Sequence, residues 1–237
     1  MTDAVPAPKP PRTLGFFETL GFALLAYAAF AISSWLSLVA LLALYDVPEA
    51  ELSNSGYFHA VVVLGALPCV LGVLWIAVRR AGRSFSEYLA LTWPERNEIV
   101  LALIVMYVVL QMLGLLGASI GVSSDPGVVA EFKGLKGAGS LFLFLVAACI
   151  GAPIFEEFAV RGFLFRGWSE SPVRPEGAIV LSSAIWAGYH FQYDLFGRFE
   201  IFVMGLVLGY FRYRSGSTFL PVVVHSAINL VICLAIA

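Results

Sequence analysis

The sequence predicts an all-α membrane protein that crosses the bilayer about seven times, and its composition and apolar runs indicate this. Of its 237 residues, 60% are hydrophobic and only 13% are charged, whereas a soluble domain carries about 25% charged residues. The apolar residues are gathered into long runs, and a membrane-spanning helix needs about 20 of them. The predicted fold is therefore a polytopic bundle of membrane helices.

The predicted elements follow one another with short connectors. Residues 1–13 are rich in proline and alanine, so we expect a disordered N-terminal tail. The next apolar run is too long for the core of a cleaved signal peptide, and we interpret it as a retained first span. The sixth run is short and could be a partial span. The expected spans are residues 18–45, 57–78, 98–121, 139–166, 177–194, 199–212 and 217–236.

The first three spans, within residues 14–137, form an N-terminal region to which the sequence assigns no role. The longest connectors are residues 79–97 and 122–138, and neither is long enough to form a separate soluble domain. The chain is thus expected to lie almost entirely in the membrane.

The basic residues predict which side each connector faces. Cytoplasmic loops of membrane proteins carry an excess of lysine and arginine. A cytoplasmic N-terminus leaves only Lys133, Lys136 and Arg198 outside, out of 14 lysines and arginines. We therefore expect an integral protein of the plasma (inner) membrane with its N-terminus in the cytoplasm. A net charge of −2 leaves no basic face for a nucleic-acid partner.

Polar groups, most of them ionisable, interrupt three of the last four runs near mid-depth. With a rise of about 1.5 Å per residue, Glu156, His190 and Asn229 each lie about 16–18 Å from the inner interface, and His225 lies about 10 Å from it. Such groups are costly inside a bilayer and usually mark a function. The sequence therefore predicts a polar site near the middle of the membrane.

Spacing assigns a first set of roles to these residues. Glu157 and Arg161 are four residues apart and can pair on one helix face. Glu156 points about 100° away and is the freer carboxylate. A water shared by Glu156 and His190 could attack a carbonyl. His225 and Asn229, again four residues apart, could hold the carbonyl oxygen as an oxyanion site.

Three motifs in this order resemble the CPBP family of intramembrane proteases, also called the CAAX-protease or Abi family, which includes the prenyl-protein endopeptidase Rce1. The first motif, Glu-Glu-x-x-x-Arg, is Glu156 to Arg161, and the third, His-x-x-x-Asn, is His225 to Asn229. The second, Phe-x-x-x-His, is present as Trp186 to His190, with tryptophan in place of phenylalanine. We interpret this departure as a change in a pocket wall.

The resemblance implies a catalytic core in residues 138–237, formed by the last four spans. It implies a glutamic-type endopeptidase with Glu156 as base, His190 as co-base, and His225 and Asn229 as oxyanion donors. The Glu157–Arg161 pair would stabilise the site. The implied partners are the lipid bilayer and a peptide or lipid-modified protein substrate.

Two questions stay open at the level of sequence. Some family members are described as metalloproteases, and a zinc ion could use Glu156, His190 and His225. We favour a site without a metal cofactor, because the chain has no His-Glu-x-x-His helix and Asn229 is a poor zinc ligand. The alternative function is a non-catalytic membrane scaffold, chaperone or immunity-type protein, with a proton-coupled transporter as a more distant one.

Overall fold

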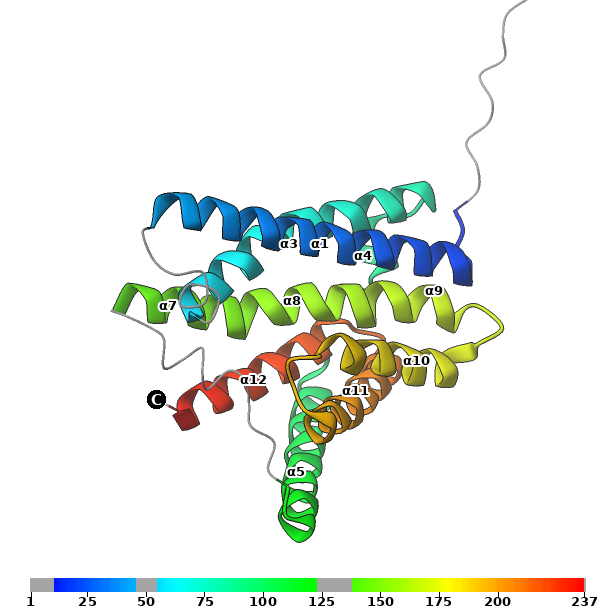
Figure 1. Ribbon diagram of the computed structural model, residues 1–237. Helices are drawn as coiled ribbons and strands as arrows, with labels where there is room; N and C mark the ends of the chain where they lie inside the picture. Colours follow the sequence, from blue (N-terminus) through cyan, green and yellow to red (C-terminus); the bar gives the residue numbers. More distant parts are fainter. Residues whose placement is uncertain (1–10, 46–54, 123–137, 237) are drawn as a thin grey trace, which may run out of the picture.

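The computed structural model describes residues 11–45, 55–122 and 138–236, and Figure 1 shows them as an all-α bundle. The described residues contain helices and no strands. The N-terminal region holds α1 (Phe16–Leu44), α3 (Gly56–Arg80), the short α4 (Phe85–Tyr88) and α5 (Arg96–Ile120). The remainder holds α7 (Ala138–Val146), η1 (Ala147–Gly151), α8 (Ala152–Glu157), η2 (Phe158–Leu164), α9 (Phe165–Ser169), α10 (Arg174–Tyr189), α11 (Leu195–Ser215) and α12 (Phe219–Ile236).

Each expected span coincides with a long helix, which confirms the predicted polytopic fold. The segments α7, η1, α8, η2 and α9 follow one another without a break and form one helix, here called the central helix. Four helices are long and apolar enough to cross a membrane: α1, α3, α5 and the central helix over Ser140–Ser169. The helix α12 is apolar but shorter. The chain is therefore an integral membrane protein.

The boundary between the fifth and sixth spans differs from the prediction. The helix α10 ends at Tyr189, five residues earlier than expected, and α11 begins at Leu195 rather than at 199. The side chain of Asp194 accepts a hydrogen bond from the backbone N–H of Gly197 at 2.7 Å and so caps α11. Because the cap starts the helix early, the sixth helix has 21 residues and is not a short partial span.

The central helix lies between two groups of helices. On one side α1 and α3 pair with each other and pack along it, and on the other α10 and α12 contact it (Figure 1). The helix α11 packs on α10, and α5 packs on α11 and α12. The central helix, which carries both carboxylates of the first motif, is thus covered by α1 and α3 on one side and by α10 and α12 on the other.

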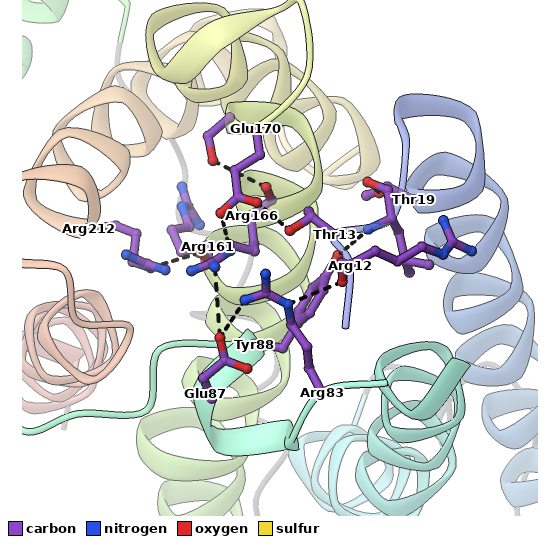
Figure 2. A network of polar contacts seen from close by, with 12 residues as sticks. Arg12, Thr13, Thr19, Arg83, Glu87, Tyr88, Arg161, Arg166, Glu170 and Arg212 are labelled. Atoms are coloured by element: carbon purple, nitrogen blue, oxygen red, sulfur yellow. Dashed lines mark hydrogen bonds and ion pairs between the residues drawn. The ribbon is translucent and has the colours of Figure 1, made fainter. Parts of the chain in front are cut away.

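One end of the bundle holds a polar network that includes Arg12, Arg83, Arg166 and Arg212, shown in Figure 2. Arg12 forms an ion pair with Glu18, and its backbone N–H donates to Ala81 O at 2.9 Å. Arg166 Nε pairs with Glu170 at 2.7 Å. Most of the expected tail, residues 1–10, lies outside the described residues, whereas Arg12 is held against the end of α3.

Candidate active site

The central helix changes its geometry on both sides of the adjacent carboxylates. Glu156 and Glu157 end the short α8, and the π-helical segments η1 and η2 flank it. Such π segments occur frequently at functional sites. In each segment a side chain from another helix bonds a backbone carbonyl: Asn229 Nδ2 donates to Ala148 O at 2.7 Å, and Arg212 Nε donates to Arg161 O at 3.1 Å.

Glu157 and Arg161 form a fully buried ion pair, with Nη1 and Oε1 3.0 Å apart and both side chains 0% exposed. The same Oε1 atom accepts a hydrogen bond from His225 Nδ1 at 2.9 Å. Arg161 Nη2 also donates to Gly205 O at 3.4 Å. A β-carbon at Gly205 would lie 3.2 Å from Arg161 Nη2 and 2.8 Å from Ser183 Cβ. Glycine therefore lets α11 approach the guanidinium, and the pair connects α11 and α12 to the central helix.

Glu156 points away from this ion pair and lines a cavity, as its position on the helix predicts. Its Oε2 atom accepts a hydrogen bond from the indole N–H of Trp186. His190 Nε2 lies 3.9 Å from the same oxygen. That separation is too long for a direct hydrogen bond, and a contact of this length between polar groups invites a bridging water.

Hydrogen bonds at Nδ1 fix the orientation of both histidine rings. His190 Nδ1 lies 2.7 Å from Trp186 O, a carbonyl that can only accept, so Nδ1 carries the proton there. In the neutral ring Nε2 is then an acceptor, and it is the atom nearest Glu156. His225 follows the same rule, because Nδ1 donates to the Glu157 carboxylate.

Asn229 is placed differently from the simple expectation of a free oxyanion donor. One N–H of its amide is used by Ala148 O, and its side chain lines the same cavities as His190 and His225. An asparagine amide has two N–H groups, so one donor is left for a ligand. The bond to Ala148 fixes the direction of that second donor.

Trp186 connects the two halves of the site, which the sequence analysis did not foresee. Its side chain is buried, and its ring lies 4.2 Å below the guanidinium carbon of Arg161. Its ring centroid is 5.4 Å from each of His190 and His225, edge to face. Trp186, expected only to form a pocket wall, thus contacts Glu156, Arg161 and both histidines. Phenylalanine would supply the ring but not the N–H.

Two adjoining cavities open at this cluster. The smaller, about 150 Å³ and here called the polar cavity, has mixed walls that include Glu156, His190, His225 and Asn229. The larger, about 410 Å³, is mostly apolar and lies between α5, α11 and α12. His190, His225 and Asn229 line both. The structure therefore brings all six sequence-predicted residues into one cluster, with Glu157 and Arg161 buried beneath it.

His59 also lines the smaller cavity, although its sequence position suggests only an interfacial residue. It comes from α3, in the region to which the sequence assigned no role. Nothing in its local sequence marks it, because the contact joins segments far apart in the chain. Tyr189, the residue before His190, also stacks on the His190 ring, with centroids 4.9 Å apart.

The donors do not form an evident metal centre. Among the described residues, no group of three or more histidine, cysteine, aspartate or glutamate side chains is placed to hold a metal ion. Nδ1 of His225 and Nδ1 of His190 are bonded to Glu157 and to a backbone carbonyl, which leaves Nε2 of each ring for a ligand. Glu156, His190 and His225 do not form such a metal-binding group in the described part of the chain.

Comparison with known proteins gives one assignment. No curated protein and no solved structure matched the chain. Residues 138–231 match the family described as type II CAAX prenyl endopeptidase Rce1-like. This range includes every residue of the three motifs and excludes α1, α3 and α5. Over residues 138–231, the chain is therefore similar to the Rce1-like type II CAAX prenyl endopeptidases.

Proposed function

We propose that this protein is an intramembrane endopeptidase of glutamic type that hydrolyses a peptide bond in a membrane-associated or lipid-modified protein. One observation carries the proposal most directly. Two proton acceptors, Glu156 Oε2 and His190 Nε2, face each other 3.9 Å apart at a cavity wall. A water between them can donate one hydrogen bond to each, which leaves an oxygen lone pair free for attack.

The proposed first step is attack of this water on the scissile carbonyl carbon. Glu156 accepts one proton as the new C–O bond forms, and His190 holds the second hydrogen of the water. The carbonyl π pair moves to oxygen and gives a tetrahedral intermediate. The C–N bond then breaks, and the proton on Glu156 passes to the leaving nitrogen, so that an acid and an amine are formed.

The developing oxyanion would be held by Asn229 and His225. Asn229 offers the N–H that Ala148 does not use. His225 offers Nε2–H in its doubly protonated form, since Nδ1–H is bound to Glu157. With that proton, the charges of Glu156, Glu157, Arg161 and His225 cancel, which limits the cost of burying them.

The reaction is proposed to proceed without a metal cofactor, since the donors do not match a zinc centre. The expected outcome is that a chelator-treated, metal-depleted preparation keeps its full rate of peptide cleavage. Metal content by elemental analysis and initial rates on the same sample check this. Loss of activity that only added zinc restores would contradict the metal-free mechanism.

The larger cavity favours a substrate that carries an apolar group beside the scissile bond. Its wall is formed mainly by apolar side chains of α5, α11 and α12, and it joins the polar cavity at His190 and Asn229. A prenyl or other lipid chain, or an apolar peptide segment, fits such a surface. We place the protein in the plasma (inner) membrane, with its N-terminus in the cytoplasm.

The alternative function is that of a non-catalytic scaffold. The observation that favours it is the buried cluster of Glu157, Arg161 and His225. These side chains connect three helices and would stabilise the bundle without any reaction. A scaffold does not, however, require Glu156 and His190 to face a cavity. The two functions therefore differ in whether the Glu156 carboxylate is required for peptide cleavage.

A direct test uses the full chain in lipid nanodiscs with a fluorogenic peptide carrying a C-terminal prenylated cysteine motif. We expect cleavage by the unaltered protein and none by Glu156→Gln, which keeps the size of the side chain. The matched control is Glu98→Gln, which replaces a partly exposed partner of Arg214 at the arginine end, away from the cavity. Equal cleavage by Glu156→Gln would exclude the proposed mechanism.

A further inference from the structure

The polar cavity opens at the end of the bundle opposite the arginines, and we infer from this that the substrate is an extracytoplasmic polypeptide segment with an apolar anchor in the membrane. The inference rests on the proposed peptidase function and specifies the substrate class of that site. It combines the direction of the polar cavity, the distribution of charge and the position of the apolar cavity.

The residues that line the polar cavity extend from the middle of the central helix to one end of the bundle. His59 lies in the first turn of α3, and Gln192 lies in the connection between α10 and α11. Cys233 lies near the end of α12, eight residues beyond His225, and both line the cavity. Eight residues of helix correspond to about 12 Å. The cavity therefore leads from the outer ends of these helices down to Glu156.

The opposite direction from Glu156 is filled by packed side chains. The central helix continues there through Arg161, Phe163, Phe165 and Trp168, all of them buried. Arg212 of α11 also lies there and is only 4% exposed. Neither cavity described above reaches these residues. A peptide approaching from this end would have to displace the core.

Charge identifies the packed end as the cytoplasmic one. Arg83, Arg166 and Arg214 lie at this end, within the network of Figure 2 or beside it, together with Arg12. The helix ends around the cavity mouth include Asp194, Glu200 and Arg198 in the described chain. Because positive residues stay on the cytoplasmic side, the mouth at Gln192 faces out.

The apolar cavity lies beside the carboxylate site and extends toward the mouth. From α11 it takes residues Gly197 to Met204, which belong to the first half of that helix. From α12 it takes residues His225 to Ile232, and from α5 residues Leu103 to Leu110, which span the middle of those helices. An apolar anchor in this cavity would lie near the middle of the membrane and would hold the adjoining peptide beside Glu156, at the inner end of the polar cavity.

The test is side-specific labelling of single cysteines in the full chain, after replacing Cys69, Cys149 and Cys233 with alanine. The probes are Gln192→Cys at the mouth and Ala148→Cys on the cavity wall. The control is Glu176→Cys, an exposed position at the start of α10 near the arginine end. A small, membrane-impermeant cationic methanethiosulfonate is added to right-side-out or inside-out vesicles, using variants that remain monodisperse in detergent.

We expect Gln192→Cys and Ala148→Cys to react in right-side-out vesicles, and Glu176→Cys to react only in inside-out vesicles. Reaction of Gln192→Cys only in inside-out vesicles would reverse the orientation and overturn the inference. Reaction of Ala148→Cys only from the arginine end, from both ends or from neither would also overturn it. Labelling does not require catalysis, so a chain labelled as expected but without Glu156-dependent cleavage would overturn the peptidase proposal instead.

Discussion

Trp186 contacts four other side chains of the site. Its N–H bonds Glu156, its face lies against Arg161, and its edges meet both histidines. A hydrogen bond to a charged group contributes about 1.5–3 kcal/mol, whereas the cation–π contact needs only an aromatic ring. The tryptophan therefore orients the carboxylate in a way that phenylalanine cannot.

Replacing Trp186 with phenylalanine should lower kcat by about 10–100-fold and leave KM nearly unchanged, because a charge-assisted hydrogen bond to the base is lost. Steady-state kinetics on the full chain measure both parameters. Trp93→Phe, at an exposed position, is the control. An unchanged kcat in Trp186→Phe would show that the indole only fills space.

Asn229→Ala should lower kcat by about 10²–10³, as expected for the loss of one oxyanion donor. It also leaves Ala148 O without its partner, which costs about 1–3 kcal/mol of stability. Melting temperature in detergent and kcat on the same preparation separate the two effects. A lower melting temperature with full kcat would leave Asn229 a purely structural role.

At the scale of single residues, spacing predicted the Glu157–Arg161 pair and the outward direction of Glu156, since both depend on positions within one helix. It could not predict that Trp186 bonds Glu156 or that His59 lines the cavity. Those contacts join different helices, and their geometry follows from packing. The signal available for Trp186 was that a buried indole N–H normally finds an acceptor.

At the scale of elements, close contact between α1 and α9 depends on Gly167. A β-carbon there would lie 2.0 Å from Thr19 Oγ1 and 2.8 Å from Thr19 Cβ, and Thr19 is fully buried. Because the obstacle includes the threonine β-carbon, rotation of the side chain cannot relieve it. The N-terminal helix is thereby held against the far end of the central helix.

Gly167→Ala should destabilise the protein by about 1–3 kcal/mol, the usual range for overpacking a core. Thr19→Ala in the same chain should restore much of that loss, because it removes the atoms nearest the new methyl group apart from Cβ. Thermal unfolding in detergent measures both. Gly72→Ala, where nothing lies within 4 Å, is the control. No difference between Gly167→Ala and this control would contradict the packing described for α1.

The apolar runs predicted the helices well, because length and hydropathy are local properties of the sequence. They misplaced the turn after α10, since the cap at Asp194 depends on one side-chain hydrogen bond. They also gave no sign of η1 and η2. There the carbonyls of Ala148 and Arg161 are bonded by side chains of α12 and α11, which a helical period cannot reveal.

At the scale of the whole molecule, the bundle has two chemically distinct ends. The polar network at the arginine end connects the residues just before α1 to α4 and to the end of α9 (Figure 2), and the opposite end leads to the carboxylate. Two N-terminal helices contribute to the site, because α3 lines the polar cavity and α5 the apolar one. The region outside the family match therefore takes part in the site.

The most direct measurement of the central claim compares the peptide termini of membrane and secreted proteins in cells with equal amounts of the unaltered protein or Glu156→Gln. The account predicts termini that depend on Glu156 and persist with the control Glu98→Gln. Identical termini in all three cell lines, with Glu156→Gln still supporting any phenotype of the gene, would contradict a peptidase and favour the scaffold.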